Sequence, residues 1–306
     1  MLQLLAGLAG GVAALLVSRA GEAAGTWNRI NGLFAPGRNA VSTVRFADHN
    51  LDSQKPQRQA EILLERAIAR SAASADRGAE ESGSEVENQI EAHIPGWRGK
   101  LQLDSQLGQL TTAALNSSDR SVQASAIEVQ LAAYGLAKNS STVDMLVRQA
   151  GSQDHARKVW ALWTLGLLGN RGIETDRVVE VLSDHLKASG NTPNRNDEDT
   201  RRWAVEGLGL VGTTSTIVPL LAAMHDDSSA VVRERAACSL AESGTLTHQQ
   251  RLAAVPQLIN YSEDPALDAQ THGWAFQALG DITKQRLPND SAAWREWYRN
   301  SGSHEQ

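Results

Sequence analysis

The feature that most constrains the fold is a helical segment that recurs along the chain. Five stretches align on one leucine, with spacings of 34, 43, 32 and 39 residues: "SAIEVQLAAYG" around Leu131, "VWALWTLGLLG" around Leu165, "RRWAVEGLGLVG" around Leu208, "RERAACSLAESG" around Leu240 and "HGWAFQALGDI" around Leu279. Second apolar runs lie between them, so the repeating unit is helix, turn, helix. A single helix pair cannot bury its apolar face, and the pairs must therefore stack on one another.

Two further patterns repeat with the leucine. An A-x-x-x-L-G pattern occurs at Ala161/Leu165/Gly166, Ala204/Leu208/Gly209 and Ala275/Leu279/Gly280. Short acidic turns precede the helices: "SQDHARK", "NDEDTRR", "HDDSSAVVRE" and "SEDPALDAQ". In these features residues 101–285 resemble the HEAT-repeat family of armadillo-like α-solenoids, in the bacterial branch with phycobilisome-lyase-like repeats. The first repeat departs from the pattern. Ala124 lies seven positions before Leu131, where the family often has a basic residue, and no glycine follows Leu131.

The resemblance implies an all-α fold, a right-handed α-solenoid of about five to six helix pairs that binds other macromolecules. No segment alternates apolar and polar residues between turns, so we expect no strands. We divide the chain into a linker at 20–56, an amphipathic helix at 57–70, a flexible acidic insert at 71–100, the solenoid with a C-terminal capping helix at 101–300, and a disordered tail at 301–306.

The N-terminal segment, residues 1–19, is a membrane anchor or a signal segment. Leu2–Val17 is a run of sixteen residues with one polar member, Gln3. That length is slightly below the roughly 17 to 25 residues of a spanning helix. We favour an uncleaved anchor through residues 2–17, with a signal peptide and a buried helix as alternatives. Four arginines follow the run, which places the solenoid on the cytoplasmic side. A signal peptide would instead make the protein periplasmic or secreted.

The string Gly207-Leu-Gly209-Leu-Val-Gly212 matches the G-x-G-x-x-G of dinucleotide-binding loops. That fingerprint needs a strand before it and a helix that opens within it. Here the preceding residues have helical spacing, and the equivalent positions of the sister segments also carry small residues. We therefore interpret Gly207 and Gly209 as packing positions and Gly212 as a helix terminator.

Tryptophan recurs five positions before the aligned leucine, at Trp160, Trp203 and Trp274, and Arg235 occupies the same position in the fourth segment. Because equivalent positions stack in a solenoid, we expect these four side chains to form a row. One interpretation is packing within and between repeats, with the arginine stacked on indole rings. The other is an exposed ladder that grips a partner, since Trp and Arg are frequent interface anchors. The four residues are our candidates for partner binding.

Basic residues recur seven positions before the leucine, at Lys158, Arg201 and Arg233, and aspartates lie in the turns before them. This pattern predicts a ladder of ion pairs between neighbouring repeats, which fixes the angle between them.

The C-terminal stretch "LPNDSAAWREWYRN" reads as a turn and a short helix. Trp294, Trp297 and Tyr298 form its apolar face and are expected to cap the last repeat. Recruitment of a partner by this aromatic patch is the alternative.

Composition narrows the function. The 306 residues carry a formal net charge of -6 without a basic stripe, which argues against a nucleic-acid partner. A single cysteine excludes a cysteine-based zinc site, and no histidine pattern or G-x-S-x-G suggests a metal, a cofactor or catalysis. We expect a non-catalytic, membrane-tethered scaffold that binds a protein or peptide. The alternative is an enzyme or enzyme auxiliary of the bilin-lyase type that holds a small ligand.

Overall fold

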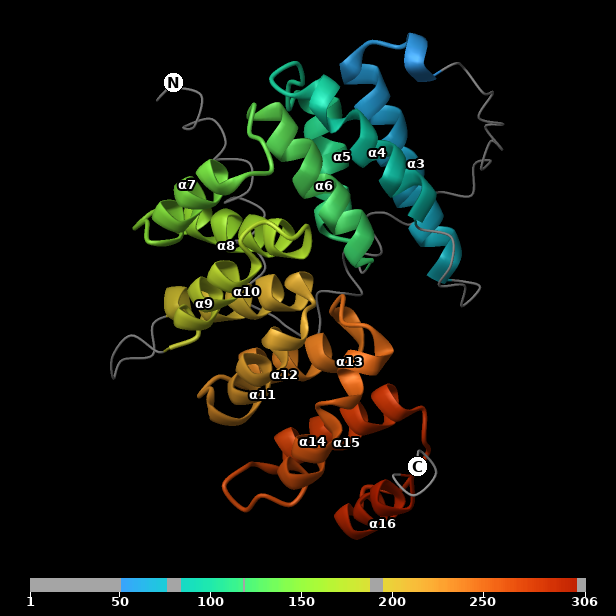
Figure 1. The fold of residues 1–306 in the computed structure, drawn as a ribbon, viewed down its shortest axis with the longest axis vertical. Coiled ribbons are helices and arrows are strands. Elements are labelled where there is room, and N and C mark those ends of the chain that lie inside the picture. The colour runs from blue at the N-terminus through green and yellow to red at the C-terminus, as the bar shows by residue number, and fades with distance from the viewer. Residues whose placement is uncertain (1–50, 76–83, 118, 188–194, 302–306) are drawn as a thin grey trace.

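The computed structural model describes residues 51–75, 84–117, 119–187 and 195–301 (Figure 1). The predicted segment at 1–19, most of the linker, residues 76–83 of the insert and nearly all of the tail lie outside these ranges. The described chain is helical throughout, which confirms the predicted all-α class. Within it, no helix is both long enough and apolar enough to cross a membrane.

Two layers of helices make up the repeat stack. One layer, which we call the aligned layer, contains α6 (Arg120–Ala133), α8 (His155–Asn170), α10 (Arg195–Val211), α12 (Ala230–Cys238) and α15 (Ala269–Thr283). The aligned leucines lie within these helices, except for Leu240, which lies just after α12 in the π-helical turn that continues it. The second layer runs beside it, on the left in Figure 1: α7 (Ser140–Ala150), α9 (Thr175–Asp184), α11 (Ile217–Asp226) and α14 (Val255–Tyr261). Short elements complete the stack: η2 (Thr214–Thr216), the π-helical turn η3 (Ser239–Ser243) and α13 (His248–Leu252).

Three of the acidic turns join helices that pack on each other. Helices α7 and α8, α11 and α12, and α14 and α15 pack on each other extensively, while α9 contacts both α8 and α10. Aspartates from these turns cap the aligned helices: Asp154 accepts a hydrogen bond from the backbone N–H of Arg157, and Asp268 from that of Thr271. A side-chain oxygen at this position satisfies a backbone donor that the helix leaves unpaired. The two capped helices, α8 and α15, therefore begin at the same point of the repeat, ten residues before Leu165 and Leu279.

Glycines let the aligned helices approach closely. A Cβ atom on Gly166 of α8 would lie 2.6 Å from the carbonyl oxygen of Gly207 in α10. A Cβ atom on Gly209 would lie 2.9 Å from the hydroxyl of Ser239, at the start of η3. Gly212, with φ of +61°, follows the end of α10. The G-x-G-x-x-G string therefore lies in one helix and its terminus, as the packing interpretation predicts.

An N-terminal unit of four helices shares its last helix, α6, with the repeat stack. It consists of α3 (Pro56–Ala75), α4 (Ser84–Trp97), α5 (Ser105–Leu115) and α6, after a short turn, η1 (Leu51–Ser53). These helices bury a core of their own, and α6 also contributes residues to the core of the repeat stack. The unit is thus continuous with the stack through α6, and the packed body begins before the predicted boundary at residue 101.

The prediction of a flexible acidic insert over 71–100 is wrong for residues 84–97. This segment forms α4, and its residues Val86, Ile90, Ile94 and Trp97 are buried against α3 and α6. The spacing of these four apolar residues is helical. The glutamates between them, however, make the segment acidic in composition, and this composition favoured the prediction of a flexible insert. The helix predicted at 57–70 exists and extends from Pro56 to Ala75.

Candidate functional site

One face of the aligned layer is built from the residues five and two positions before the aligned leucines; we call it the Trp face. Trp163, two before Leu165, stacks on Trp203, five before Leu208, with ring centroids 5.0 Å apart. One helix later, Glu206 and Arg235 occupy the same two positions and form an ion pair of 2.7 Å. From α8 to α10 and from α10 to α12, each helix is therefore displaced along its axis by about three residues, which at 1.5 Å per residue is about 4.5 Å.

This displacement changes the expected row of Trp160, Trp203, Arg235 and Trp274. Trp203 stacks on Trp163 of the preceding helix, and Arg235 pairs with Glu206 of the preceding helix. Trp160 of α8 donates from Nε1 to the side-chain oxygen of Gln130 in α6, at 3.2 Å. It also packs edge-on against Tyr134, just after α6. Each of these residues thus joins two helices.

Exposure separates the four candidates. Trp203 is 7% exposed, so it belongs to the packing interpretation and does not offer its indole face to a partner. Trp160 and Trp274 are half-buried, and the indole N–H of Trp160 is hydrogen-bonded to α6. The Arg235 side chain is 33% exposed. Arg235 and Trp274, at equivalent positions of the neighbouring helices α12 and α15, therefore form the accessible part of the Trp face.

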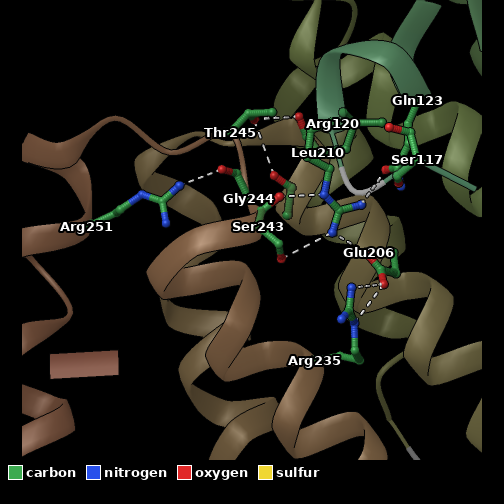
Figure 2. A network of polar contacts seen from close by, with 11 residues as sticks. Ser117, Arg120, Gln123, Glu206, Leu210, Arg235, Ser243, Gly244, Thr245 and Arg251 are labelled. Atoms are coloured by element: carbon green, nitrogen blue, oxygen red, sulfur yellow. Dashed lines mark hydrogen bonds and ion pairs between the residues drawn. The ribbon is translucent and has the colours of Figure 1, made fainter. Parts of the chain in front are cut away.

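A buried carboxylate holds Arg235. Glu206 lies on α10, with its side chain 6% exposed, and one of its oxygens accepts from Nε and Nη2 of Arg235, at 2.9 and 2.7 Å. The other oxygen pairs with Arg120 of α6, which is 86 residues earlier in the sequence (Figure 2). Burial alone would raise the pKa of Glu206, but the two guanidinium groups outweigh it and hold the pKa below its ordinary value. The carboxylate is therefore charged at neutral pH.

Arginines also bind the backbone at the end of α12. Arg120 donates from Nε to the carbonyl of Ser243 in η3. From the other side, Arg251 of α13 donates to the carbonyl of Gly244 at 2.6 Å (Figure 2). It also donates to the carbonyl of Leu246, at 2.9 Å, and to two carbonyls of η3. Carbonyls at a helix C-terminus lack intrahelical partners and attract cations. Arg120 thus fastens the N-terminal unit to both α10 and the end of α12.

The predicted basic ladder is present at two of its three positions. Arg201 binds Asp227 with two bonds, at 2.7 and 3.0 Å, and both side chains are buried. Arg233 binds Asp268 at 2.6 Å. Each aspartate lies in the turn before the next aligned helix, so these pairs join neighbouring repeats. Asp227 raises the pKa of Arg201.

Lys158, the third ladder position, shows no ion pair within the described ranges. The neighbouring His155 binds Asp199 instead, with His155 Nε2 2.7 Å from the carboxylate. This contact joins α8 to α10, so the connection between these repeats is made by a histidine three residues earlier in the same helix.

Another histidine links the second layer to the α14–α15 turn. His225 lies at the end of α11 between two carboxylates, with Nδ1 2.5 Å from Asp226 and Nε2 3.1 Å from Asp264. The ring also packs on Tyr261. Both ring nitrogens can donate only in the imidazolium form. The hydrogen bonds to Asp226 and Asp264 raise the pKa of His225 above its ordinary value of 6.5, although burial opposes this.

The helix α16 (Ser291–Ser301) covers the last repeat. Trp294 is 1% exposed within the core of the stack, and its Nε1 donates to the carbonyl of Pro288 at 3.1 Å. Trp297 packs edge-on against Trp294, whereas Tyr298 is 45% exposed. Of the three predicted capping residues, Trp294 therefore seals the core, Trp297 supports it and Tyr298 points toward solvent.

Sequence reasoning missed Glu206 and Glu128. Glu128 of α6 is also buried and binds Arg171, just after α8, at 2.7 Å. A signal was available, because both glutamates interrupt apolar helical segments, "AVEGLG" and "AIEVQL". A buried carboxylate needs charged partners. The sequence around each glutamate does not indicate which residues pair with it. Within the described ranges, no group of three or more His, Cys, Asp or Glu is placed to hold a metal ion.

Comparison with known proteins agrees with this architecture. A family model for HEAT repeats matches residues 192–280, which extend from the beginning of α10 into α15 and include Glu206, Arg235 and Trp274. The chain therefore contains a HEAT-repeat region at these residues. No curated protein matches the chain.

Proposed function

We propose that this chain is a non-catalytic scaffold that binds a protein or peptide partner on the Trp face, around Arg235 and Trp274. HEAT-repeat domains typically serve as protein-binding scaffolds, and the matched residues 192–280 contain both side chains. Stacked helix pairs present a wide surface whose geometry is set before the partner arrives. The A-x-x-x-L-G pattern supports the phycobilisome-lyase-like type of repeat for these residues.

The proposal rests on the observation that Arg235 is held in place by an ion pair and is still partly exposed. Buried Glu206 binds one edge of its guanidinium, and the side chain remains 33% exposed. An arginine held in this way loses little conformational entropy when it binds a partner. Half-buried Trp274 lies at the equivalent position of α15, a helix that contacts α12, and offers apolar area there. Arg and Trp are the residue types that dominate binding energy at interfaces.

A site-specific photocrosslinker tests the location. The crosslinking residue is placed at exposed Gln277, one turn after Trp274, and for comparison at Val218 in the second layer, which is 73% exposed. We expect a discrete adduct from Gln277 in intact cells that Trp274→Ala abolishes, and no such adduct from Val218. Adducts from Val218 alone would place the binding surface on the second layer.

We also propose that residues 2–17 tether the scaffold to a membrane, with the solenoid on the cytoplasmic side. The support is the apolar run itself and the arginines that follow it. A tether raises the local concentration of the scaffold near membrane-bound partners. The test is fractionation of the full-length protein. It should pellet with membranes and resist alkaline carbonate, whereas the double variant Leu8→Arg, Leu15→Arg should become extractable. Wild-type protein that stays in the supernatant with its N-terminus intact would refute the tether.

A further inference from the structure

Resting on the proposed scaffold function, we infer that the Trp face between α12 and α15 binds a peptide segment that pairs a carboxylate with a large apolar side chain about three residues away. The carboxylate binds the outer edge of Arg235, and the apolar side chain packs on Trp274. The inference assigns a chemistry to the partner of the proposed site.

Arg235 supplies an anion-binding group. A guanidinium has five N–H donors, and here Nε and Nη2 both bind a single oxygen of Glu206. The other oxygen of Glu206 belongs to Arg120. Two guanidinium groups therefore share the carboxylate of Glu206, and Arg235 keeps N–H donors that this carboxylate does not use. Donors on a planar, fixed fork match an incoming carboxylate with two parallel bonds.

The neighbouring helix offers a surface without formal charge. Residues 269–280 of α15 contain no Lys, Arg, Asp or Glu. Gly273 and Gln277, one position before and three positions after half-buried Trp274, are exposed, and a Cβ atom on Gly273 would meet nothing within 4 Å. An indole flanked by a glycine and a neutral amide accepts an aromatic or aliphatic side chain without burying an unpaired charge.

The spacing of the two groups follows from the packing of the helices that carry them. Helices α12 and α15 are in contact, and packed helices lie about 8–10 Å apart. An extended peptide advances about 3.3 Å per residue. An extended segment that crosses from α12 to α15 therefore places its two recognised side chains about three residues apart. Whether the acidic or the apolar residue comes first in the peptide sequence indicates in which direction the peptide crosses the two helices.

Selection from a displayed library of random twelve-residue peptides on the immobilised full-length protein tests this chemistry. We expect enriched peptides to share an Asp or Glu two to four residues from a Trp, Phe or Leu. Replacement of that acid by Gln or Asn should weaken binding about tenfold or more, because it removes the charge from the hydrogen bonds to Arg235. Fluorescence anisotropy with a labelled copy of the most enriched peptide measures the change.

Variants of the protein distinguish the inferred partner chemistry from the proposed binding site itself. Arg235→Gln should weaken the labelled peptide about tenfold or more, whereas Arg235→Lys, which keeps the charge near Glu206, should retain part of the affinity. Arg177→Gln, at an exposed position of α9 in the second layer, is the matched control and should bind as the wild type. A circular-dichroism melt of each variant confirms that it is folded.

Three results would overturn the inference. Enriched peptides that lack an acid, binding that is unchanged in folded Arg235→Gln, or no enrichment at all would each exclude this partner chemistry. If acid-free peptides bind and Trp274→Ala abolishes binding, the proposed site stands and only the acidic partner is wrong. If neither Trp274→Ala nor Arg235→Gln changes peptide binding, and the crosslinks also map to Val218, the proposed site fails as well.

Discussion

Gly166 of α8 and Gly207 of α10 lie backbone against backbone, so a Cβ atom on Gly166 would come within 2.6 Å of the Gly207 carbonyl oxygen. We expect Gly166→Ala to lower the free energy of unfolding by about 1–3 kcal/mol, because backbone atoms cannot move aside as a side chain can. Urea denaturation measures the change. Gly273→Ala in α15 is the control. It has open space and should be neutral or stabilise by up to about 1 kcal/mol. Equal stability of the two variants would mean that α8 and α10 are not in close contact here.

The second prediction concerns Glu206. Glu206→Gln keeps the shape but removes the charge that Arg120 and Arg235 share, and removal of one partner from a buried pair costs about 3–5 kcal/mol. The depressed pKa of Glu206 fixes the pH dependence. The contribution of this carboxylate is present above its ordinary pKa of 4.5 and is lost as the pH falls through the lower, folded-state pKa. Wild-type and variant unfolding curves should therefore converge in acid. Glu234→Gln, exposed on α12, should change stability by less than about 0.5 kcal/mol.

Trp203 and Trp274 should respond differently to truncation. Trp203→Ala removes a 7% exposed ring that packs on Trp163, and we expect a loss of about 3–5 kcal/mol. Trp203→Phe should lose much less, since it keeps a ring and removes an indole N–H that has no acceptor within the described ranges. Trp274→Ala should lower the melting temperature less than Trp203→Ala while weakening partner binding. Similar melting temperatures for both alanine variants would place Trp274 in the core as well.

The raised pKa of His225 predicts that the contact between α11 and the α14–α15 turn depends on pH. Its pKa is raised in the folded state, so its contribution to stability is fully present below pH 6.5 and is lost as the pH rises through the raised pKa. The stability difference between wild type and His225→Gln should shrink as the pH rises from 6 to 9. In an NMR titration, Asp264→Asn should lower the pKa of His225, because it removes one of the two flanking carboxylates. An unchanged titration midpoint would contradict the contact with Asp264.

The capping helix supplies the fifth prediction. Trp294→Ala should cost about 3–5 kcal/mol, because the indole is 1% exposed in the core of the last repeat. Tyr298→Ala, in the same helix, should be nearly neutral because that side chain is 45% exposed. Thermal melts of the two variants measure the difference. If Tyr298→Ala destabilises as much as Trp294→Ala, α16 buries a different face.

The repeat register could be predicted from the sequence because it depends on local spacing. The aligned leucines, the small residues around them and the aspartate-containing turns recur at helical intervals, and they determine which residues form helices and which helices stack. The same patterning made Gly207, Gly209 and Gly212 recognisable as packing and terminating positions. In α4 the pattern was also present, but the acidic residues between Val86, Ile90 and Ile94 led to the wrong prediction of a flexible insert.

Only the tertiary structure decided which side chains meet. The offset of about three residues between successive aligned helices pairs Trp203 with Trp163 and Arg235 with Glu206. That offset is a relation between neighbouring helices, such as α8 and α10 where Gly166 approaches Gly207, and no single repeat encodes it. The pairing of Arg120 with Glu206 joins residues 86 positions apart. The sequence by itself therefore determined the repeats, and three-dimensional packing determined that Trp203 is buried while Arg235 remains accessible, because exposure depends on neighbours that the chain brings together only when it folds.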